Sequence, residues 1–304
     1  MKGKESRMET SQEARTQWHK QRKLAVGASE SAAILGVDPW SSPLEVWARK
    51  TGRIVDDDLE DERMKWGHIL EPVILGEFQE RIGSGIAVSR HDQTNVVRHR
   101  NFPAIPMSCT PDAHGSDGRL IQIKTTSAFN SEAWKDGPPL HVQVQEQHEM
   151  AVCERELATV VALIGGQRLK FWDIERNDSF IEMLEEQCSA WWERFVMCDE
   201  QPPADDGDTK TIRMLEKLHP DDSGEEVILG DDFIEIDQQL QTIKESMKAL
   251  RSEQKELENK LKGAIGAATF GILPSGISYS WKTQNRAGYT VADTKFRVLR
   301  RFSK

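Results

Sequence analysis

The chain has 304 residues, with 40 Lys or Arg against 50 Asp or Glu, and a formal net charge of -10. This length allows one large domain with an appendage, or two domains. The charge excludes a surface that is basic throughout, although a basic groove for nucleic acid can coexist with acidic outer faces. The sequence contains no apolar stretch of membrane-spanning length and no secretory signal.

The N-terminus begins with a polar stretch, which predicts a flexible tail over residues 1–14. The four cysteines, Cys109, Cys153, Cys188 and Cys198, show no C-x-x-C spacing. We therefore expect reduced thiols in a cytosolic protein rather than zinc ligands or a disulfide framework.

A basic helical segment, Arg15–Lys23, contains Trp18 and leads into a short turn. Ser29 is a candidate N-cap for a small helix over Glu30–Leu35. A serine and free amides at a helix N-terminus suit a phosphate, although for a lone serine we favour ordinary helix capping.

After an acidic loop at Asp56–Glu62, apolar residues recur at helical spacing from Glu62 to Ile82 and predict a long helix. Pro72 lies inside this helix and predicts a kink or a restart. Glu71 stands among apolar neighbours, so we expect it to lie near a metal or in an ion pair. A solvated helix carboxylate is the alternative.

The stretch Met107–Ser127 (MSCTPDAHGSDGRLIQIKTTS) is interpreted as a pair of strands joined by a turn. The strands are expected at Met107–Thr110 and Arg119–Thr126. Asp112 would then lie on the strand next to the triplet that follows the turn.

That triplet is Gln122-Ile123-Lys124, in which the first and third side chains share one face of the strand. An acid opposite such a triplet can form a hydrolytic metal site. Asp112 and the carbonyl of Ile123 would hold a hard divalent ion, and Lys124 would orient or activate water. Taken alone, the triplet also fits an ordinary hairpin.

The next segment, His141–Glu154, predicts a helix that places Gln145, His148 and Glu149 on one polar face. His148 is either a metal ligand or, as we favour, a histidine with ordinary structural partners. The following Leu157–Ile164 and Gln167–Ile174 predict a β-hairpin with a Gly-Gly turn.

The C-terminal third changes composition. Residues 201–231 indicate an acidic linker with one helix at Lys210–Leu218. Asp232–Gly266 predicts a long helix whose apolar residues alternate in steps of four and three, typical of a coiled coil or of an arm against a neighbour. Gly276–Lys304 predicts β structure, including a strand at Tyr289–Val291. Its basic and aromatic residues suit DNA contacts or a simple hairpin capping the helix.

Five segments together resemble the YqaJ-type viral recombinase nucleases, lambda-exonuclease-like members of the PD-(D/E)XK superfamily. They occur in matching order and spacing across residues 15–198. They are Arg22 with Gly27-Ala28-Ser29, Trp66-Gly67 with Leu70-Glu71-Pro72, Thr110-Pro111-Asp112, Gln122-Ile123-Lys124-Thr125-Thr126, and Gln145 to Met150 with Ala162-Leu163-Ile164-Gly165-Gly166.

The resemblance implies an α/β fold with a PD-(D/E)XK restriction-endonuclease-like core over residues 15–200. This is a mixed central sheet flanked by helices, followed by a C-terminal long helix and small β-hairpin in an arm over residues 232–304. It implies an enzyme that uses Mg²⁺, or Mn²⁺, to degrade linear double-stranded DNA 5′→3′. The product would be 3′ single-stranded tails for a single-strand annealing protein.

The resemblance also implies roles for particular residues. Asp112, Gln122 and the carbonyl of Ile123 would be metal ligands, and Glu71 would be an accessory acid that reaches a second metal through water. Lys124 would be the base or stabiliser that orients water.

Gln145 would lie at the edge of this site. Arg22, Ser29 and Thr110 match positions that hold the 5′-phosphate of the recessed strand. A guanidinium, two hydroxyls and a helix N-terminus suit such a phosphate. Relatives suggest a homo-oligomer, including a ring-type trimer, in a phage or prophage-type protein of the bacterial cytoplasm.

Gln122 departs from the pattern, which has Glu or Asp at this position, and we expect it to impair catalysis because a neutral amide is a poorer ligand for a hard dication. It could be a deliberate substitution that traps an uncleaved DNA complex, a natural loss of activity, or a change that a neighbouring carboxylate compensates. We favour the first, because the other motifs are intact. The alternative functions are a catalytically inactive DNA-end-binding protein that recruits a recombinase, and a structure-specific or single-strand nuclease.

Overall fold

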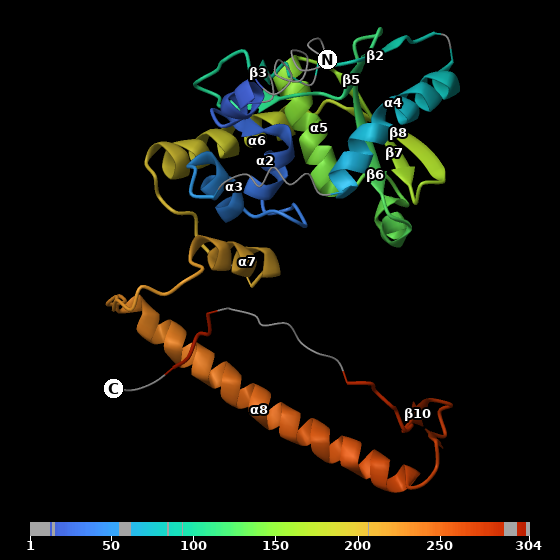
Figure 1. The fold of residues 1–304 in the computed structure, drawn as a ribbon, viewed down its shortest axis with the longest axis vertical. Helices are drawn as coiled ribbons and strands as arrows, with labels where there is room; N and C mark the ends of the chain where they lie inside the picture. The colour runs from blue at the N-terminus through green and yellow to red at the C-terminus, as the bar shows by residue number, and fades with distance from the viewer. Residues whose placement is uncertain are drawn as a thin grey trace, which may run out of the picture. The chain divides into compact units, whose positions relative to one another are not determined.

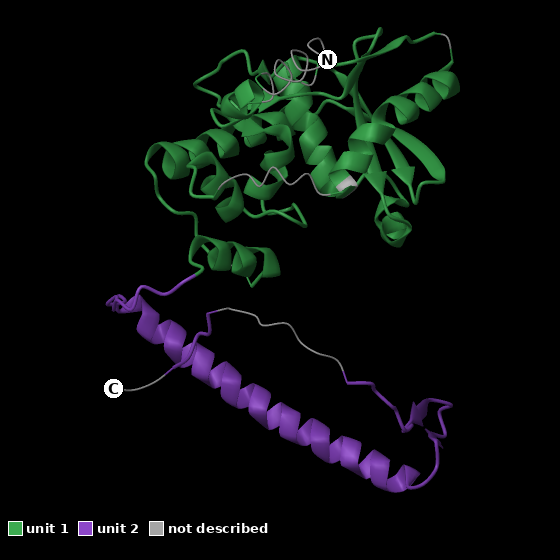
Figure 2. Cartoon of the chain, in the orientation of Figure 1, with its two compact units in different colours: residues 1–220 green, residues 221–304 purple. Residues whose placement is uncertain are grey.

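The computed structural model describes residues 13, 16–54, 62–83, 85–92, 94–205, 207–288 and 297–301. Most of the predicted tail, most of the acidic loop and the predicted strand Tyr289–Val291 lie outside the described residues. The chain divides into two compact units, Met1–Pro220 and Asp221–Lys304 (Figure 2).

The first unit contains mixed strands and helices (Figure 1). In chain order they are β1 (Val26–Gly27), α2 (Ala28–Ile34), α3 (Pro43–Lys50), α4 (Glu62–Ile82), β2 (Val88–Arg90), β3 (Val97–Arg98), β4 (Met107–Cys109), β5 (Ala113–Gly115), β6 (Leu120–Thr126), the 3₁₀-helix η1 (Ala128–Trp134), α5 (Leu140–Cys153), β7 (Leu157–Ile164), β8 (Arg168–Glu175), α6 (Asp178–Trp191), the π-helix η2 (Trp192–Met197) and α7 (Thr209–Leu218).

A five-stranded sheet with the order β2-β5-β6-β7-β8 forms the centre of this unit. Strands β6 and β7 are parallel, and the other neighbours are antiparallel. Because successive side chains of a strand point to opposite faces, β6 contributes to two apolar layers. Ile121 and Ile123 pack with Phe78 of α4, whereas Leu120 packs with Met150 of α5.

Helices α4 and α5 therefore cover opposite faces of the sheet (Figure 1). The fold class predicted from the sequence is confirmed: a mixed central sheet flanked by helices, followed by a long C-terminal helix and a small hairpin. Helix α4 has the predicted bounds and continues through Pro72.

The predicted pairing of Met107–Thr110 with Arg119–Thr126 is wrong. Strand β4 lies in a second sheet, between β1 and β3, and the partner of β6 is β5, formed by residues predicted as part of the turn. The tight turn is shorter than expected, because Gly118 adopts a φ of 90° and lets the chain reverse over few residues. Asp112 nevertheless lies beside β6, since it directly precedes β5.

Ser29 is not the N-cap predicted for the following helix. Helix α2 starts earlier, at Ala28, with Gly27 as N-cap. The Glu30 carboxylate accepts a hydrogen bond from the Gly27 N–H at 2.7 Å. The backbone amide of the N-cap residue is therefore paired with the side chain at the third helical position. Ser29 is therefore an exposed residue in the first turn of α2.

Helix α7 occupies the position expected for a helix in the acidic segment. Its Met214 is buried in the main apolar cluster of the first unit, which also contains Leu44 and Trp47 of α3. The predicted hairpin of β7 and β8 is confirmed, and Gly165 and Gly166 form its turn with positive φ values.

The second unit consists of α8 (Asp232–Ile265), β9 (Phe270–Ile272) and β10 (Ser278–Ser280), with the two strands paired antiparallel. Helix α8 buries none of its residues within the described chain, so its apolar positions face outward. No helix of the described residues combines the length and apolar character needed to cross a bilayer.

Candidate active site

Asp112 directly precedes β5 and reaches across to β6. Its Oδ2 accepts a hydrogen bond from the Ile123 N–H at 2.7 Å. Burial raises the pKa of Asp112 to about 6, although the Lys124 charge and the Ile123 N–H act in the opposite direction. The charge of Glu71 also raises this pKa, which places both carboxyl groups in one electrostatic environment.

Lys124 is connected to helix α5 through a short chain of hydrogen bonds. Its Nζ donates to Gln145 Oε1 at 2.9 Å, and Gln145 Nε2 donates to Glu149 Oε1 at 3.0 Å. Gln145 and Glu149 lie one helical turn apart, so both can face β6. The structure therefore places Gln145 in contact with Lys124, as one site, and connects Glu149 to both through Gln145.

Three further oxygen-bearing side chains between β6 and α5 are buried: Gln122, Glu146 and Glu149 are 5%, 0% and 1% exposed. Within the described residues, Gln122 Oε1, both carboxylate oxygens of Glu146 and Glu149 Oε2 are buried without a hydrogen-bond partner. Burial, followed by the charge of Glu149, raises the pKa of Glu146 well above its usual range. Burial also raises the pKa of Glu149 to about 7.

Glu71 approaches the same site from helix α4. Its two oxygens contact His68 Nδ1 and Arg90 Nη2, each at 2.8 Å, and the residue is 8% exposed. The expectation of a paired carboxylate is therefore confirmed, and that of a solvated one is wrong. Each Glu71 oxygen keeps a second lone pair, so the carboxylate can retain both partners and still accept a hydrogen bond from a water molecule.

The candidate phosphate residues gather where β1 and β4 end. These strands are parallel, with Gly27 opposite Ser108, so Ser29 and Thr110 both follow that end of the pair. Trp18 Nε1 donates to Thr110 Oγ1 at 3.3 Å, and the Arg22 guanidinium lies over the Trp18 ring at 4.6 Å.

A family model described as a YqaJ-like viral recombinase domain matches residues 17–156. The chain is also 30% identical over 267 residues to the uncharacterized protein YqaJ of Bacillus subtilis (strain 168), covering 86% of this chain and 82% of that protein. The chain belongs to the YqaJ-like viral recombinase family. The family predicted from the five motifs is thereby confirmed.

Among solved structures, the chain is similar to an alkaline exonuclease from Laribacter hongkongensis, with 21% identity and a TM-score of 0.47, over 59% of this chain and 92% of that one. It is also similar to a phage-related exonuclease from Haemophilus somnus 129PT, with 13% identity and a TM-score of 0.42, over 58% of this chain and 97% of that one.

A divalent cation implied by the YqaJ-like resemblance would suit the chemistry of this site. The described ranges contain no cluster of three or more His, Cys, Asp or Glu side chains already arranged around a metal position. They do contain carboxylate and amide oxygens that are buried without partners, and such oxygens are the ligands that Mg²⁺ and Mn²⁺ prefer. The donor set therefore fits a hard dication.

His148 is a structural residue of this YqaJ-like domain. Its Nε2 donates to the Ser108 carbonyl at 3.1 Å, and burial lowers the pKa of the ring to about 4, so the side chain is neutral near pH 7. The favoured interpretation of a histidine with ordinary structural partners holds for Nε2, whereas Nδ1 is buried without a hydrogen-bond partner among the described residues.

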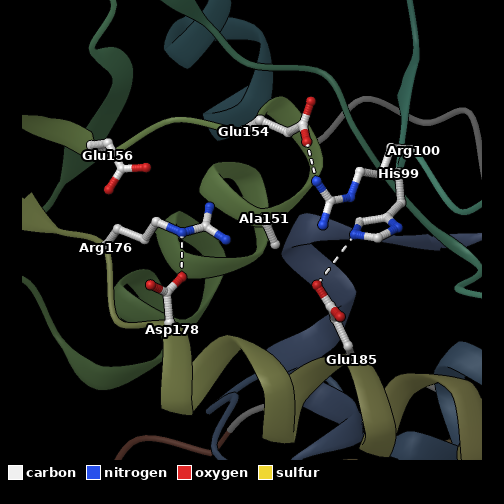
Figure 3. Close-up of a pocket in the computed structure, with 8 residues that line it drawn as sticks. All are labelled: His99, Arg100, Ala151, Glu154, Glu156, Arg176, Asp178 and Glu185. Carbon is white, nitrogen blue, oxygen red and sulfur yellow. Dashed lines mark hydrogen bonds and ion pairs between the residues drawn. The ribbon is translucent and has the colours of Figure 1, made fainter.

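A polar pocket of about 220 Å³ lies away from this site in the first unit (Figure 3). Six of its side chains pair with one another, in the contacts of Arg100 with Glu154, Arg176 with Asp178 and His99 with Glu185. None of the residues predicted for the active site lines it. The lining residues are His99, Arg100, Ala151, Glu154, Glu156, Arg176, Asp178 and Glu185.

Three residues around this site were missed by the sequence analysis. They are Trp18, which contacts both Arg22 and Thr110, Arg90, which pairs with Glu71, and Glu146. Glu146 carries a signal in the sequence, because it lies four residues from both Val142 and Met150 and so shares their apolar helix face. Nothing in the local sequence identifies Trp18 or Arg90, whose partners are 92 and 19 residues away.

Proposed function

We propose that this chain is a metal-dependent exonuclease that degrades linear double-stranded DNA 5′→3′. Residues 15–200 would form the nuclease core and residues 232–304 an arm. The observation that carries the proposal is the meeting of Asp112, Lys124 and the buried oxygens of α5 at β6. Family membership supports a recombination role, in which 3′ single-stranded tails pass to an annealing protein.

Asp112, the Gln122 amide oxygen and the Ile123 carbonyl would hold a divalent cation, either Mg²⁺ or Mn²⁺. Glu71 would assist through water. A cation bound there would supply charge neutralisation at the scissile phosphate and acidify nearby water. The hydrogen bond that the Ile123 N–H donates to the Asp112 carboxylate holds this ligand against the strand that carries the others.

Lys124 would orient the attacking water and stabilise negative charge on the phosphate. Its ammonium is held by Gln145, which limits the positions that Nζ can occupy. Such positioning matters, because a displaced catalytic group loses much of the advantage of its preorganised geometry.

Arg22, Ser29 and Thr110 would hold the terminal 5′-phosphate of the recessed strand. The arrangement supports this role, since Trp18 links Arg22 to Thr110 and Ser29 lies exposed in the first turn of a helix. A fixed terminal phosphate would let the enzyme advance by one nucleotide after each cut.

We expect a homo-oligomer, with a ring-type trimer as one form, that acts on DNA ends in the cytoplasm of a bacterial host. The second candidate function, an inactive DNA-end-binding protein that recruits a recombinase, is favoured by one observation, the neutral amide at Gln122.

The test is digestion of a linear, 5′-phosphorylated duplex with Mg²⁺, followed with separate 5′ and 3′ labels. We expect mononucleotides from the 5′ end, released more slowly than by the Gln122→Glu variant because Gln122 impairs catalysis, and no digestion of a closed circular duplex. Asp112→Asn should abolish cleavage and retain DNA binding, whereas the matched control Asp117→Asn, on the exposed β5–β6 turn, should cleave normally.

Binding of ends without cleavage by the wild-type chain would favour the inactive end-binding protein. Preference for nicked or single-stranded DNA would instead indicate a structure-specific or single-strand nuclease.

A further inference from the structure

Helix α5 directs one charged residue into an otherwise apolar contact with the sheet. Val142, Glu146 and Met150 follow each other at intervals of four and share one helix face. Val142 belongs to a buried cluster with Val160 and Ala162, and Met150 to another with Leu120 and Ala158. Glu146 lies between these two apolar anchors and therefore faces the sheet.

Strand β6 presents Gln122 to the same interior. Leu120, Gln122 and Lys124 share one strand face, and Leu120 is the residue that packs against Met150. Gln122 Oε1 and both oxygens of Glu146 are buried, and among the described residues none of them has a hydrogen-bond partner. Two oxygen donors thus face one interior from the strand and from the helix.

A fully buried carboxylate is stable only when a cation, a proton or hydrogen-bond donors compensate its charge. The Lys124 ammonium acts on Glu146 electrostatically, but its hydrogen bond goes to Gln145. Glu149 already uses one oxygen to accept from Gln145. Glu146 is therefore the acid of this group whose two oxygens are both available to a cation.

We propose that Glu146 of helix α5 supplies the metal-binding carboxylate that strand β6 lacks at Gln122. The inference rests on the proposed nuclease function. It selects the third explanation for Gln122, in which a neighbouring acid compensates, over a deliberate substitution or a natural loss of activity. The site then has the same total charge as one with Glu at position 122 and a neutral residue at position 146.

The experiment measures Mn²⁺ binding to the full-length chain by isothermal titration calorimetry, so the result does not depend on cleavage. We expect Glu146→Gln to weaken Mn²⁺ affinity by about tenfold or more. Glu132→Gln, which makes the same chemical change at an exposed glutamate, should bind as the wild type does. The double variant Gln122→Glu/Glu146→Gln should restore the affinity, since it returns the carboxylate to the strand.

Melting in EDTA separates loss of a ligand from loss of the fold. Glu146→Gln removes a buried acid whose two oxygens have no hydrogen-bond partner among the described residues, so the metal-free variant should melt at the same temperature as the wild type or higher. The rise in melting temperature on adding Mn²⁺ should be smaller than for the wild type. Should Glu146→Gln fail to fold, the charge-conserving double variant decides the question by the same Mn²⁺ titration.

This inference would be overturned if folded Glu146→Gln binds Mn²⁺ as the wild type does while Asp112→Asn no longer binds Mn²⁺. The proposed nuclease function would remain intact in that case. A folded double variant that binds no Mn²⁺ would overturn this inference too. A wild-type chain that neither binds Mn²⁺ nor cleaves DNA would overturn the proposed function itself.

Discussion

Lys124 shows how a single side chain can link the two layers of the site. It extends from β6, donates to Gln145 on α5, and acts electrostatically on Asp112 and Glu146. A lysine in this position stabilises several neighbouring carboxylates at once, so its removal affects more than one interaction.

We predict that Lys124→Met lowers the single-turnover rate of duplex cleavage by about 10²- to 10⁴-fold, because the charge that positions water and phosphate is lost. DNA binding, measured by fluorescence anisotropy, should change little. Lys135→Met, at an exposed lysine directly after η1, is the matched control. Equal rates for Lys124→Met and the wild type would exclude a catalytic role for this lysine.

The phosphate residues allow a test of end recognition. Arg22→Gln should remove the preference for 5′-phosphorylated over 5′-hydroxyl ends, because a neutral amide cannot replace a charge-assisted bond to phosphate. Trp18→Phe should weaken this preference in part, since the ring remains but the hydrogen bond to Thr110 is lost. Cleavage rates on the two substrates give the ratio.

Arg81→Gln, on the exposed surface of α4, should keep the wild-type ratio. A preference for 5′-phosphate that survives Arg22→Gln would place the anchor elsewhere.

Cysteine reactivity should follow burial. Cys188 is fully buried, and burial raises the pKa of its thiol to about 12, so the reactive thiolate is scarce at pH 8. Cys198 is exposed. We predict that N-ethylmaleimide labels Cys198 in the native protein and reaches Cys188 only after denaturation, as peptide mass spectrometry would show. Rapid native labelling of Cys188 would contradict the burial described here.

At the scale of elements, helix α5 combines two tasks. Its apolar residues fix it against the sheet, and polar residues of the same helix complete the site beside Lys124. Helix α8 shows the opposite case, because it has a regular apolar seam and buries none of its residues within the described chain. Its seam residues are Ile236, Leu240, Ile243, Met247, Leu250, Leu257 and Leu261.

This exposed seam predicts that the α8 segment associates with a second helix. A peptide of residues 232–266 should show helicity by circular dichroism that rises with peptide concentration, because association buries the seam. Leu250→Asp in the peptide should remove that dependence, whereas Ser252→Asp, off the seam, should not. Helicity that is the same at all concentrations would argue against a coiled coil.

At the scale of the whole molecule, the chain has two units with different sources of stability. The first unit holds the buried clusters on both faces of its sheet, whereas α8 of the second buries no residue. Helix α7 belongs to the first unit, since Met214 is only 2% exposed in its main cluster. The acidic segment predicted as a linker therefore includes a helix that packs on the core.

Truncation should show this difference. Residues 1–220 should fold with a melting temperature near that of the full chain, whereas residues 1–200 should lose about 2–5 kcal/mol of unfolding free energy, the typical cost of losing one large buried apolar side chain. Urea denaturation of both fragments gives the comparison. Equal stability of the two would mean that α7 contributes nothing to the core.

Local patterns in the sequence predicted the long elements well. The bounds of α4 and of β7 follow from side-chain periodicity and from glycines that permit positive φ, and both are properties of short segments. The order of the five motifs likewise predicted the family. The shorter β4 and β5 were misassigned, because three residues carry too little periodicity to choose among partners.

The sequence by itself therefore determined the fold class and the family, and it singled out Asp112, Lys124 and Gln145 as candidate site residues. Only the tertiary structure decided which side chains meet, since Gln145 and Lys124 are 21 residues apart and Trp18 and Thr110 are 92 apart. Glu146 is the decisive case. Its position on an apolar helix face is visible in the sequence, but the strand that this face meets depends on how α5 packs against β6.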